Sequence, residues 1–125
     1  MDLSVKTEAF QQDDQSWLAS AHGTDTARPI TLDVSTFTAN THYPQGYIKS
    51  GVLLGKITAS GSYGPYDGAA TDGRQTAAGF LLDAVKAPSS ASTPVQGALL
   101  WHGAVLGAKT TPANPTSAPS LIAVF

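Results

Sequence analysis

The 125-residue sequence contains no cysteine, so it offers neither a disulfide framework nor a thiolate ligand for a metal ion. Only 13% of its residues are charged, and the net charge of -2 gives no electrostatic basis for binding nucleic acid. No apolar run approaches the roughly 20 residues that span a bilayer. The N-terminus lacks the apolar core of a signal peptide, so we do not expect export by the ordinary secretory route. From these absences we expect that the protein binds neither nucleic acid nor a membrane.

Motifs of catalysis and metal binding are missing as well. The nucleophile pattern Gly-x-Ser-x-Gly and the phosphate loop Gly-x-x-x-x-Gly-Lys-Ser/Thr do not occur. His22, His42 and His102 show neither His-x-x-x-His nor His-Glu-x-x-His spacing, which argues against zinc. His102 stands in an apolar stretch, so we expect it to be a buried or interfacial side chain bonded to a carbonyl. We predict no enzyme activity, no catalytic residue, no cofactor and no metal site.

What the sequence does contain is turn chemistry beside strand-like stretches, most clearly over residues 64–85. A Gly-Pro pair and two Asp-Gly pairs, at Asp67 and Asp72, favour tight turns. No Glu follows at the spacing of a calcium loop, so we expect both carboxylates to cap turns. Residues 76–85 then alternate like a strand, and Gly79 indicates a close backbone approach.

The rest of the chain repeats this organisation. Strands are expected in five regions, at residues 30–34, 47–58, 76–85, 96–107 and 121–125. Gly51 and Gly55 interrupt the second region and indicate bulges or a bend. Proline-rich and small-residue stretches separate the strands, and little helix is expected. The sequence therefore predicts a mainly β protein, a small single-domain β-barrel or sandwich-like fold.

Residues 1–28 differ from this pattern, because they are polar with isolated large apolar side chains. We interpret them as an extended N-terminal arm in front of a β-rich domain formed by residues 29–125. The arm either adds a strand to a partner and seats Phe10 or Trp17 in a pocket, or folds over its own domain, or is disordered as a terminus.

Three short motifs carry a resemblance to a known family. Tyr63-Gly-Pro-Tyr-Asp67, Ala70-Thr-Asp-Gly73 and Thr76-Ala-Ala-Gly-Phe-Leu81 follow one another in strand-turn-strand order. Together they resemble the central signature of the bacteriophage head decoration proteins, the group that includes the lambda-type capsid-stabilising protein. The resemblance runs from about residue 29 to residue 106. It implies a compact, β-rich domain.

The resemblance further implies a structural virion protein. Such a protein binds as homotrimers at local threefold positions on the outer surface of the expanded capsid and stabilises the head against DNA pressure. Its partners would be the major capsid protein and its own copies, and it would reside in the host cytoplasm before assembly. The expected capsid contacts are Val5, Lys6, Thr7, Glu8, Phe10 and Trp17. The candidate trimer interface or threefold loop comprises Tyr63, Pro65, Tyr66, Asp67, Asp72 and Arg74.

Two alternatives remain open. A carbohydrate- or receptor-binding β module on a virion surface would need exposed aromatic side chains for stacking, and buried ones would count against it. The candidates are Trp17, Tyr43, Tyr47, Tyr63, Tyr66 and Trp101. A small hydrolase would need a pocket that joins His22 or His102 to an Asp and a Ser.

Overall fold

The computed structural model describes residues 15–38, 42–43, 46–90, 92–111, 113, 115, 118–119 and 121–125. Short strands dominate this part of the chain, and its named helices are single 3-10 turns. The elements are η1 (Thr24–Thr26), β1 (Arg28–Leu32), η2 (Val34–Thr36), β2 (Tyr47–Ile48), β3 (Leu53–Lys56), β4 (Tyr63–Pro65), β5 (Ala77–Leu81), β6 (Val85–Lys86), β7 (Val95–Leu100), β8 (Gly103–Val105), η3 (Gly107–Lys109) and β9 (Ile122–Val124). The prediction of a mainly β fold with little helix is confirmed.

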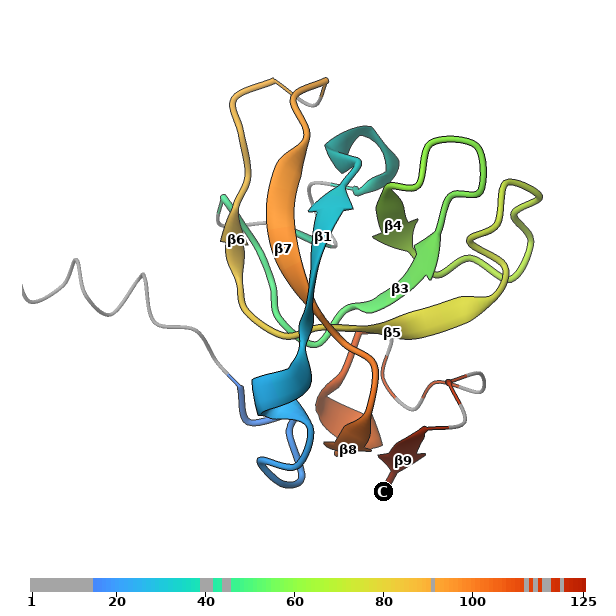
Figure 1. Cartoon of the computed structure of the whole chain (residues 1–125). Helices are drawn as coiled ribbons and strands as arrows, with labels where there is room; N and C mark the ends of the chain where they lie inside the picture. Colours follow the sequence, from blue (N-terminus) through green and yellow to red (C-terminus); the bar gives the residue numbers. More distant parts are fainter. Residues whose placement is uncertain are drawn as a thin grey trace, which may run out of the picture.

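Five of these strands form a closed barrel in the order β1-β4-β3-β5-β7 (Figure 1). β1 runs antiparallel to β7 along its whole length, from the Arg28–Leu99 pair to the Leu32–Val95 pair. Its other edge meets β4 in parallel at the single pair Leu32–Tyr63. Because β1 has a partner on both sides, the ring has no open edge there.

Most observed strands are shorter than the expected regions, whereas β1 keeps the expected five residues but begins at Arg28, and Val34 lies in η2. The stretch 76–85 divides into β5 and β6, and the stretch 96–107 divides into β7 and β8. β4 was not predicted, because its Tyr-Gly-Pro sequence reads as turn chemistry. The bulge expected near Gly55 is confirmed by a register shift between Leu54 and Gly55. The close approach expected at Gly79 is also confirmed, since an added Cβ would collide with the carbonyl oxygen of Leu100.

Two hydrophobic cores lie on opposite faces of the barrel strands. The first consists of Ile30, Leu32, Val34, Phe37, Ile48, Val52, Leu54, Leu81 and Leu99. The second consists of Trp17, Leu53, Phe80, Leu82, Leu100, Val105 and Ile122. All five barrel strands contribute to the first core or pack against it, so it fills the interior. Consecutive residues such as Leu53 and Leu54 point into different cores, as strand geometry requires.

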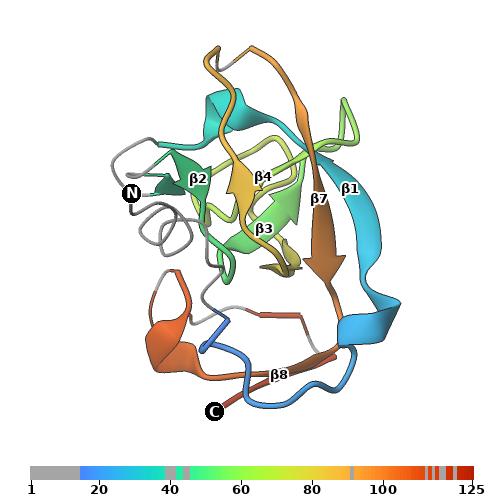
Figure 2. The ribbon, with the colours of Figure 1, turned by 90° about the vertical axis from the view of Figure 1, so that its left-hand side faces the viewer.

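The second core lies outside the barrel and is closed by both ends of the described chain. Trp17 reaches it from before the first strand, and Ile122 reaches it from β9. Figures 1 and 2 show residues 15–27, β8 and β9 together at the lower end of the molecule, below the barrel. We call this the lower end.

Candidate binding surface

The lower end is a layer of three adjacent segments. β8 pairs in parallel with β9, from Gly103–Ile122 to Val105–Val124. On its other edge, Val105 forms an antiparallel bridge with Leu18. The amide of Leu106 donates to the Trp17 carbonyl at 2.6 Å. Among the described residues β9 is the edge of this sheet, and an edge strand offers backbone groups to a further strand.

Exposed apolar side chains gather on the same edge. The large hydrophobic residues that stand exposed in the described chain are Leu121 (55%), Val124 (40%) and Phe125 (76%). Both backbone groups of Phe125 bond to the neighbouring segment: its N–H donates to the Val105 carbonyl at 2.9 Å and its carbonyl accepts from the Gly107 amide at 3.0 Å. Exposed apolar side chains that lie close together in a chain are candidates for contact with another protein. The C-terminal strand therefore carries exposed apolar side chains on a backbone that is bonded to β8.

The structure fixes the root of the N-terminal arm at residues 15–18. The side-chain amide of Gln15 donates to the Leu82 carbonyl at 2.7 Å and to Asp83 Oδ1 at 2.9 Å. Because Val105 pairs with Leu18 on one side and with Val124 on the other, these two backbones lie roughly 10 Å apart, two strand spacings. Residues 15–18, the first that the structure describes, therefore lie at the end that also carries the exposed apolar residues.

Trp17, expected as a capsid anchor, lies in the second core of its own chain. Its side chain is 2% exposed, and its ring centroid lies 5.9 Å from that of Phe80. The indole N–H donates to Ser50 Oγ at 3.0 Å. Gly51, at φ +86°, faces the ring, and an added Cβ would come within 2.9 Å of it. In this position Trp17 offers no surface to a partner.

The remaining expected capsid contacts lie outside the described residues. They are Val5, Lys6, Thr7, Glu8 and Phe10. Of the interpretations of the arm, folding over its own domain describes residues 15–27, which pack on the barrel.

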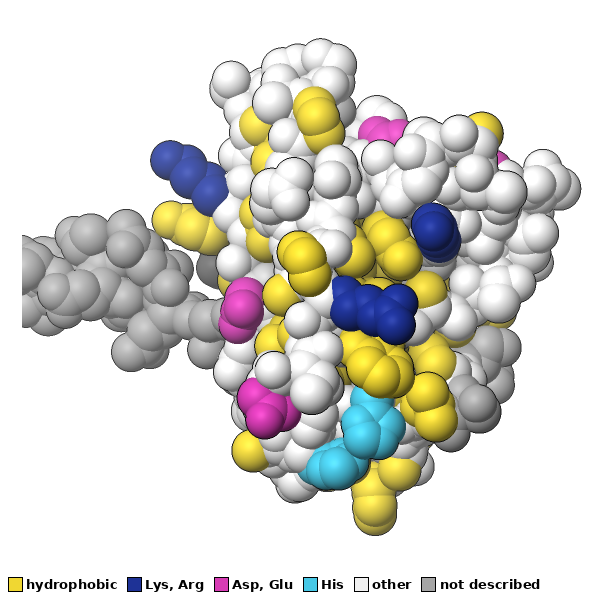
Figure 3. All heavy atoms as spheres, viewed as in Figure 1, with side chains coloured by type: hydrophobic (Ala, Val, Ile, Leu, Met, Phe, Trp, Pro, Cys, Tyr) yellow, Lys and Arg dark blue, Asp and Glu magenta, His cyan; other side chains and the backbone are white. Residues whose placement is uncertain are grey.

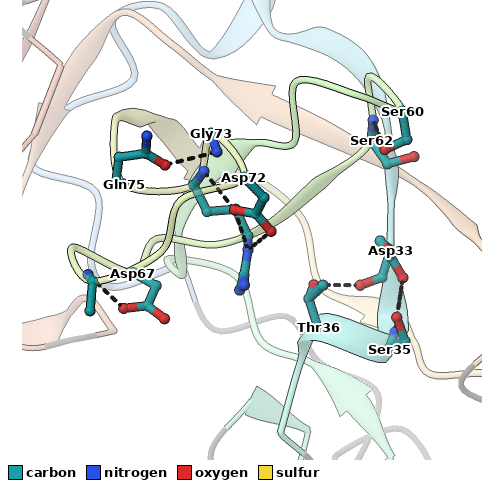
Figure 4. A network of polar contacts seen from close by, with 11 residues as sticks. Asp33, Ser35, Thr36, Ser60, Ser62, Asp67, Asp72, Gly73 and Gln75 are labelled. Atoms are coloured by element: carbon teal, nitrogen blue, oxygen red, sulfur yellow. Dashed lines mark hydrogen bonds and ion pairs between the residues drawn. The ribbon is translucent and has the colours of Figure 1, made fainter.

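The two Asp-Gly turns cap themselves as the sequence predicts (Figure 4). Asp67 Oδ1 accepts from the Ala69 amide at 3.0 Å, and Asp72 Oδ1 accepts from the Arg74 amide at 3.2 Å. Arg74 Nε also donates to Asp72 Oδ2 at 3.0 Å. The Arg74 amide, followed by the Arg74 side chain, lowers the pKa of the Asp72 carboxyl. The loop is therefore braced by its own polar groups.

The candidate threefold residues divide into two sets. Pro65 is buried within β4, Tyr63 packs against the first core and Tyr66 against the second. Asp67 and Asp72 are exposed, and Arg74 is half-buried. Tyr63, Pro65 and Tyr66 therefore support the barrel, and the three charged residues shape the surface of the loop.

This arrangement gives little support to the carbohydrate-binding and hydrolase alternatives. None of the six aromatic candidates is exposed: Trp17 is buried and the other five are half-buried. The ring of His102 contacts another histidine and not the expected carbonyl: its Nε2 lies 3.3 Å from Nε2 of His22. The described residues contain no group of three or more His, Cys, Asp or Glu placed to hold a metal ion. Within them, no helix has the length and apolarity to cross a bilayer.

A hollow beside the lower end contains only some of the polar residues that a hydrolase would require. It is lined by Gln15, Leu18, Ser20, Ala21, Thr24, Leu82 and Asp83. Ser20 and Asp83 thus face it, but neither His22 nor His102 belongs to the lining. The pocket that would favour a hydrolase is not formed there.

The chain is thus a small β-barrel protein with self-capped loops and exposed apolar side chains at one end. The family model of bacteriophage lambda head decoration protein D matches residues 14–118, and the chain belongs to this family. The resemblance noted from the sequence is thereby confirmed. The family consists of structural capsid decoration proteins, so this is a capsid-associated virion protein and not a member of an enzyme family. Comparisons with curated proteins and with solved structures find no match.

Proposed function

We propose that this protein binds the outer surface of the expanded capsid as homotrimers at local threefold positions and stabilises the head against the pressure of packaged DNA. One observation carries the proposal beyond the family match. The root of the arm, the edge strand β9 and the exposed residues Leu121, Val124 and Phe125 share one end of the molecule. We assign the lower end to the capsid.

Docking combines two contacts with the major capsid protein. Residues 1–14 supply the reach, with Val5, Lys6, Thr7 and Glu8 adding a strand to the capsid subunit and Phe10 filling a pocket. The apolar edge of β9 lies beside the point where the arm leaves, so both contacts engage one neighbourhood of the capsid. Two linked contacts raise the overall affinity, because the second binds within the complex formed by the first.

Stabilisation then follows from linkage and requires no turnover. A ligand that binds only the expanded lattice stabilises it by about 2.7 kcal/mol per site when its concentration is 100-fold above Kd. The lattice offers many equivalent positions, so modest contributions add up. Before assembly the protein is free in the host cytoplasm.

The trimer contact is assigned to the loop that carries Asp67, Asp72 and Arg74. Its capped turns and the ion pair hold it in one conformation, which lowers the entropy cost of association. This loop lies beside β3 and β5, away from residues 15–18 (Figure 1). A trimer contact at the loop would therefore leave the lower end accessible to the capsid.

Co-sedimentation with expanded capsids tests the proposal, with unexpanded shells as the control. The truncation should remove residues 1–14 and stop there, because Trp17 belongs to the second core. The truncated protein is expected to keep its circular dichroism spectrum and melting temperature and to lose binding to expanded shells. Full-affinity binding by the truncated chain would show that the arm is not the docking element.

A matched pair of variants tests which end faces the capsid. Val124→Lys places a charge on the apolar edge, and Ser89→Lys places the same charge in the exposed loop at the opposite end (Figures 1 and 2). We expect the first variant to bind about tenfold more weakly or worse, a loss of 1.4 kcal/mol or more, and the second to bind normally. The reverse result would assign the opposite end of the molecule to the capsid.

A further inference from the structure

Two histidines that are far apart in sequence meet on the surface of the lower end. Nε2 of His22 lies 3.3 Å from Nε2 of His102, and the ring centroids are 4.5 Å apart at an interplanar angle of 62°. His22 is exposed and His102 half-buried. Figure 3 shows histidine side chains, in cyan, at the surface of this end. With both rings neutral, one Nε2–H donates to the other nitrogen.

The spacing of the two nitrogens is that of ligands to one metal ion. Zinc binds imidazole nitrogen at about 2.0–2.1 Å and prefers tetrahedral geometry, which sets two nitrogen ligands about 3.3–3.4 Å apart. We propose that His22 and His102 form a surface site for a divalent transition metal ion of the zinc, nickel and copper class. The ring that now donates would carry its proton on Nδ1 instead, so both Nε2 atoms bind the ion, and water completes the coordination.

The backbone holds the two rings in this relation. Each histidine is followed by a glycine that packs against the other histidine's carbonyl. A Cβ on Gly23 would overlap the oxygen of His102, and a Cβ on Gly103 would lie 2.6 Å from the oxygen of His22. Gly23 also has φ +84°, which side chains larger than hydrogen rarely adopt. Since the two segments touch through their backbones, little ordering is needed when the ion binds.

Trp101 fixes the same pair of segments and supplies a reporter. Its indole N–H donates to the Thr26 carbonyl at 2.8 Å, which ties the turn after His22 to the strand before His102. The Trp101 ring centroid is 5.6 Å from that of His102. Copper(II) quenches tryptophan emission at short range, so an ion bound at the histidine pair will quench Trp101.

The experiment titrates the full chain, without a histidine tag, with copper(II) chloride while tryptophan emission is recorded. We expect saturable quenching at one ion per chain. Excess zinc chloride, which binds imidazole but does not quench, should restore the emission. The readout is independent of capsid binding, so the decoration function and the metal site are tested separately.

Glutamine variants distinguish the pair from every other histidine. His22→Gln and His102→Gln are each expected to lower the affinity for copper, read from the quenching titration, about tenfold or more, because only one histidine ligand remains. His42→Gln removes the third histidine of the chain and should leave the titration unchanged. Equal affinity in the parent and in His22→Gln, with both proteins folded by circular dichroism, would overturn the proposal. So would a loss of binding in His42→Gln.

Discussion

The two cores share strands but draw on different parts of the chain. The first core takes its residues from between Ile30 and Leu99, where strands pair into the barrel. The second core uses the opposite faces of β3, β5 and β7 and then needs Trp17 and Ile122 from the two chain ends. A barrel interior is closed by its own ring of strands, whereas an apolar outer face stays wet until other segments cover it.

Because of this difference, the packing of the second core and the proposed capsid contact depend on the same end of the molecule, the lower end. The segments that cover the second core are the same segments that form the lower end, namely residues 15–27, β8 and β9. The apolar edge of β9 and the root of the arm therefore sit on a layer whose packing depends on Trp17. Substitutions in the first core should destabilise the barrel, and substitutions in the second core should also loosen the segments that form the proposed binding surface.

The largest effect is expected from Trp17→Ala. Removing a buried large aromatic side chain costs about 3–5 kcal/mol, and the bond to Ser50 is lost too. Urea unfolding measures the loss. Trp101→Ala is the matched control, because Trp101 is half-buried and should cost less. If the two variants lose equal stability, the second core contributes less than its burial indicates.

A smaller but sharper test uses two neighbours in β3. Leu53 and Leu54 are 1% and 0% exposed and face the second and the first core, respectively. Each Leu→Ala change should cost about 2–5 kcal/mol. Hydrogen exchange separates them: Leu53→Ala should speed exchange at the Ala19 and Leu106 amides, which hold the lower layer, beyond the global change. Identical exchange patterns would mean that the two cores open as one unit.

The same contrast explains what the sequence could predict. The capping by Asp67 and Asp72, the alternation along residues 76–85 and the final strand depend on local residue order, and all were predictable. β4 was missed because Gly64 and Pro65 are turn formers in local sequence, and the strand is defined by its pairing with β1 and β3. The burial of Trp17 was one of the alternatives for the arm, but residue order could not single it out, because its partner surface, around Gly51 and Phe80, exists only after the barrel has formed.

The candidate site was predictable to a similar degree. The family resemblance and the arm indicated a capsid partner, but nothing in residue order indicates the shared end. That end depends on Val105 pairing with both Leu18 and Val124. The His22–His102 pair was not predicted for the same reason, because the sequence motifs for metal sites that we applied cover only ligands at short spacings along the chain.

The smallest expected effect lies beside the first core, at His42. Burial and the nearby charge of Lys49 lower the pKa of this histidine from 6.5. Its ring packs edge-on against Phe37, and its Nδ1 accepts from the Thr38 amide at 2.8 Å. A lowered pKa means that folding favours the neutral ring. Its contribution to stability is thus complete above pH 6.5 and is lost as the pH falls below 6.5 through the folded pKa.

His42→Asn should flatten this part of the pH–stability curve, because Asn Oδ1 still accepts from the Thr38 amide but does not titrate. Lys49→Gln should weaken the dependence without removing it, since burial remains as the larger cause. Denaturant unfolding across the acid range measures both variants. The effect is small because His42 is only half-buried and solvent screens its charge. An unchanged curve in His42→Asn would assign the acid sensitivity of the fold to other groups, and the first core would then carry no titrating contact at this position.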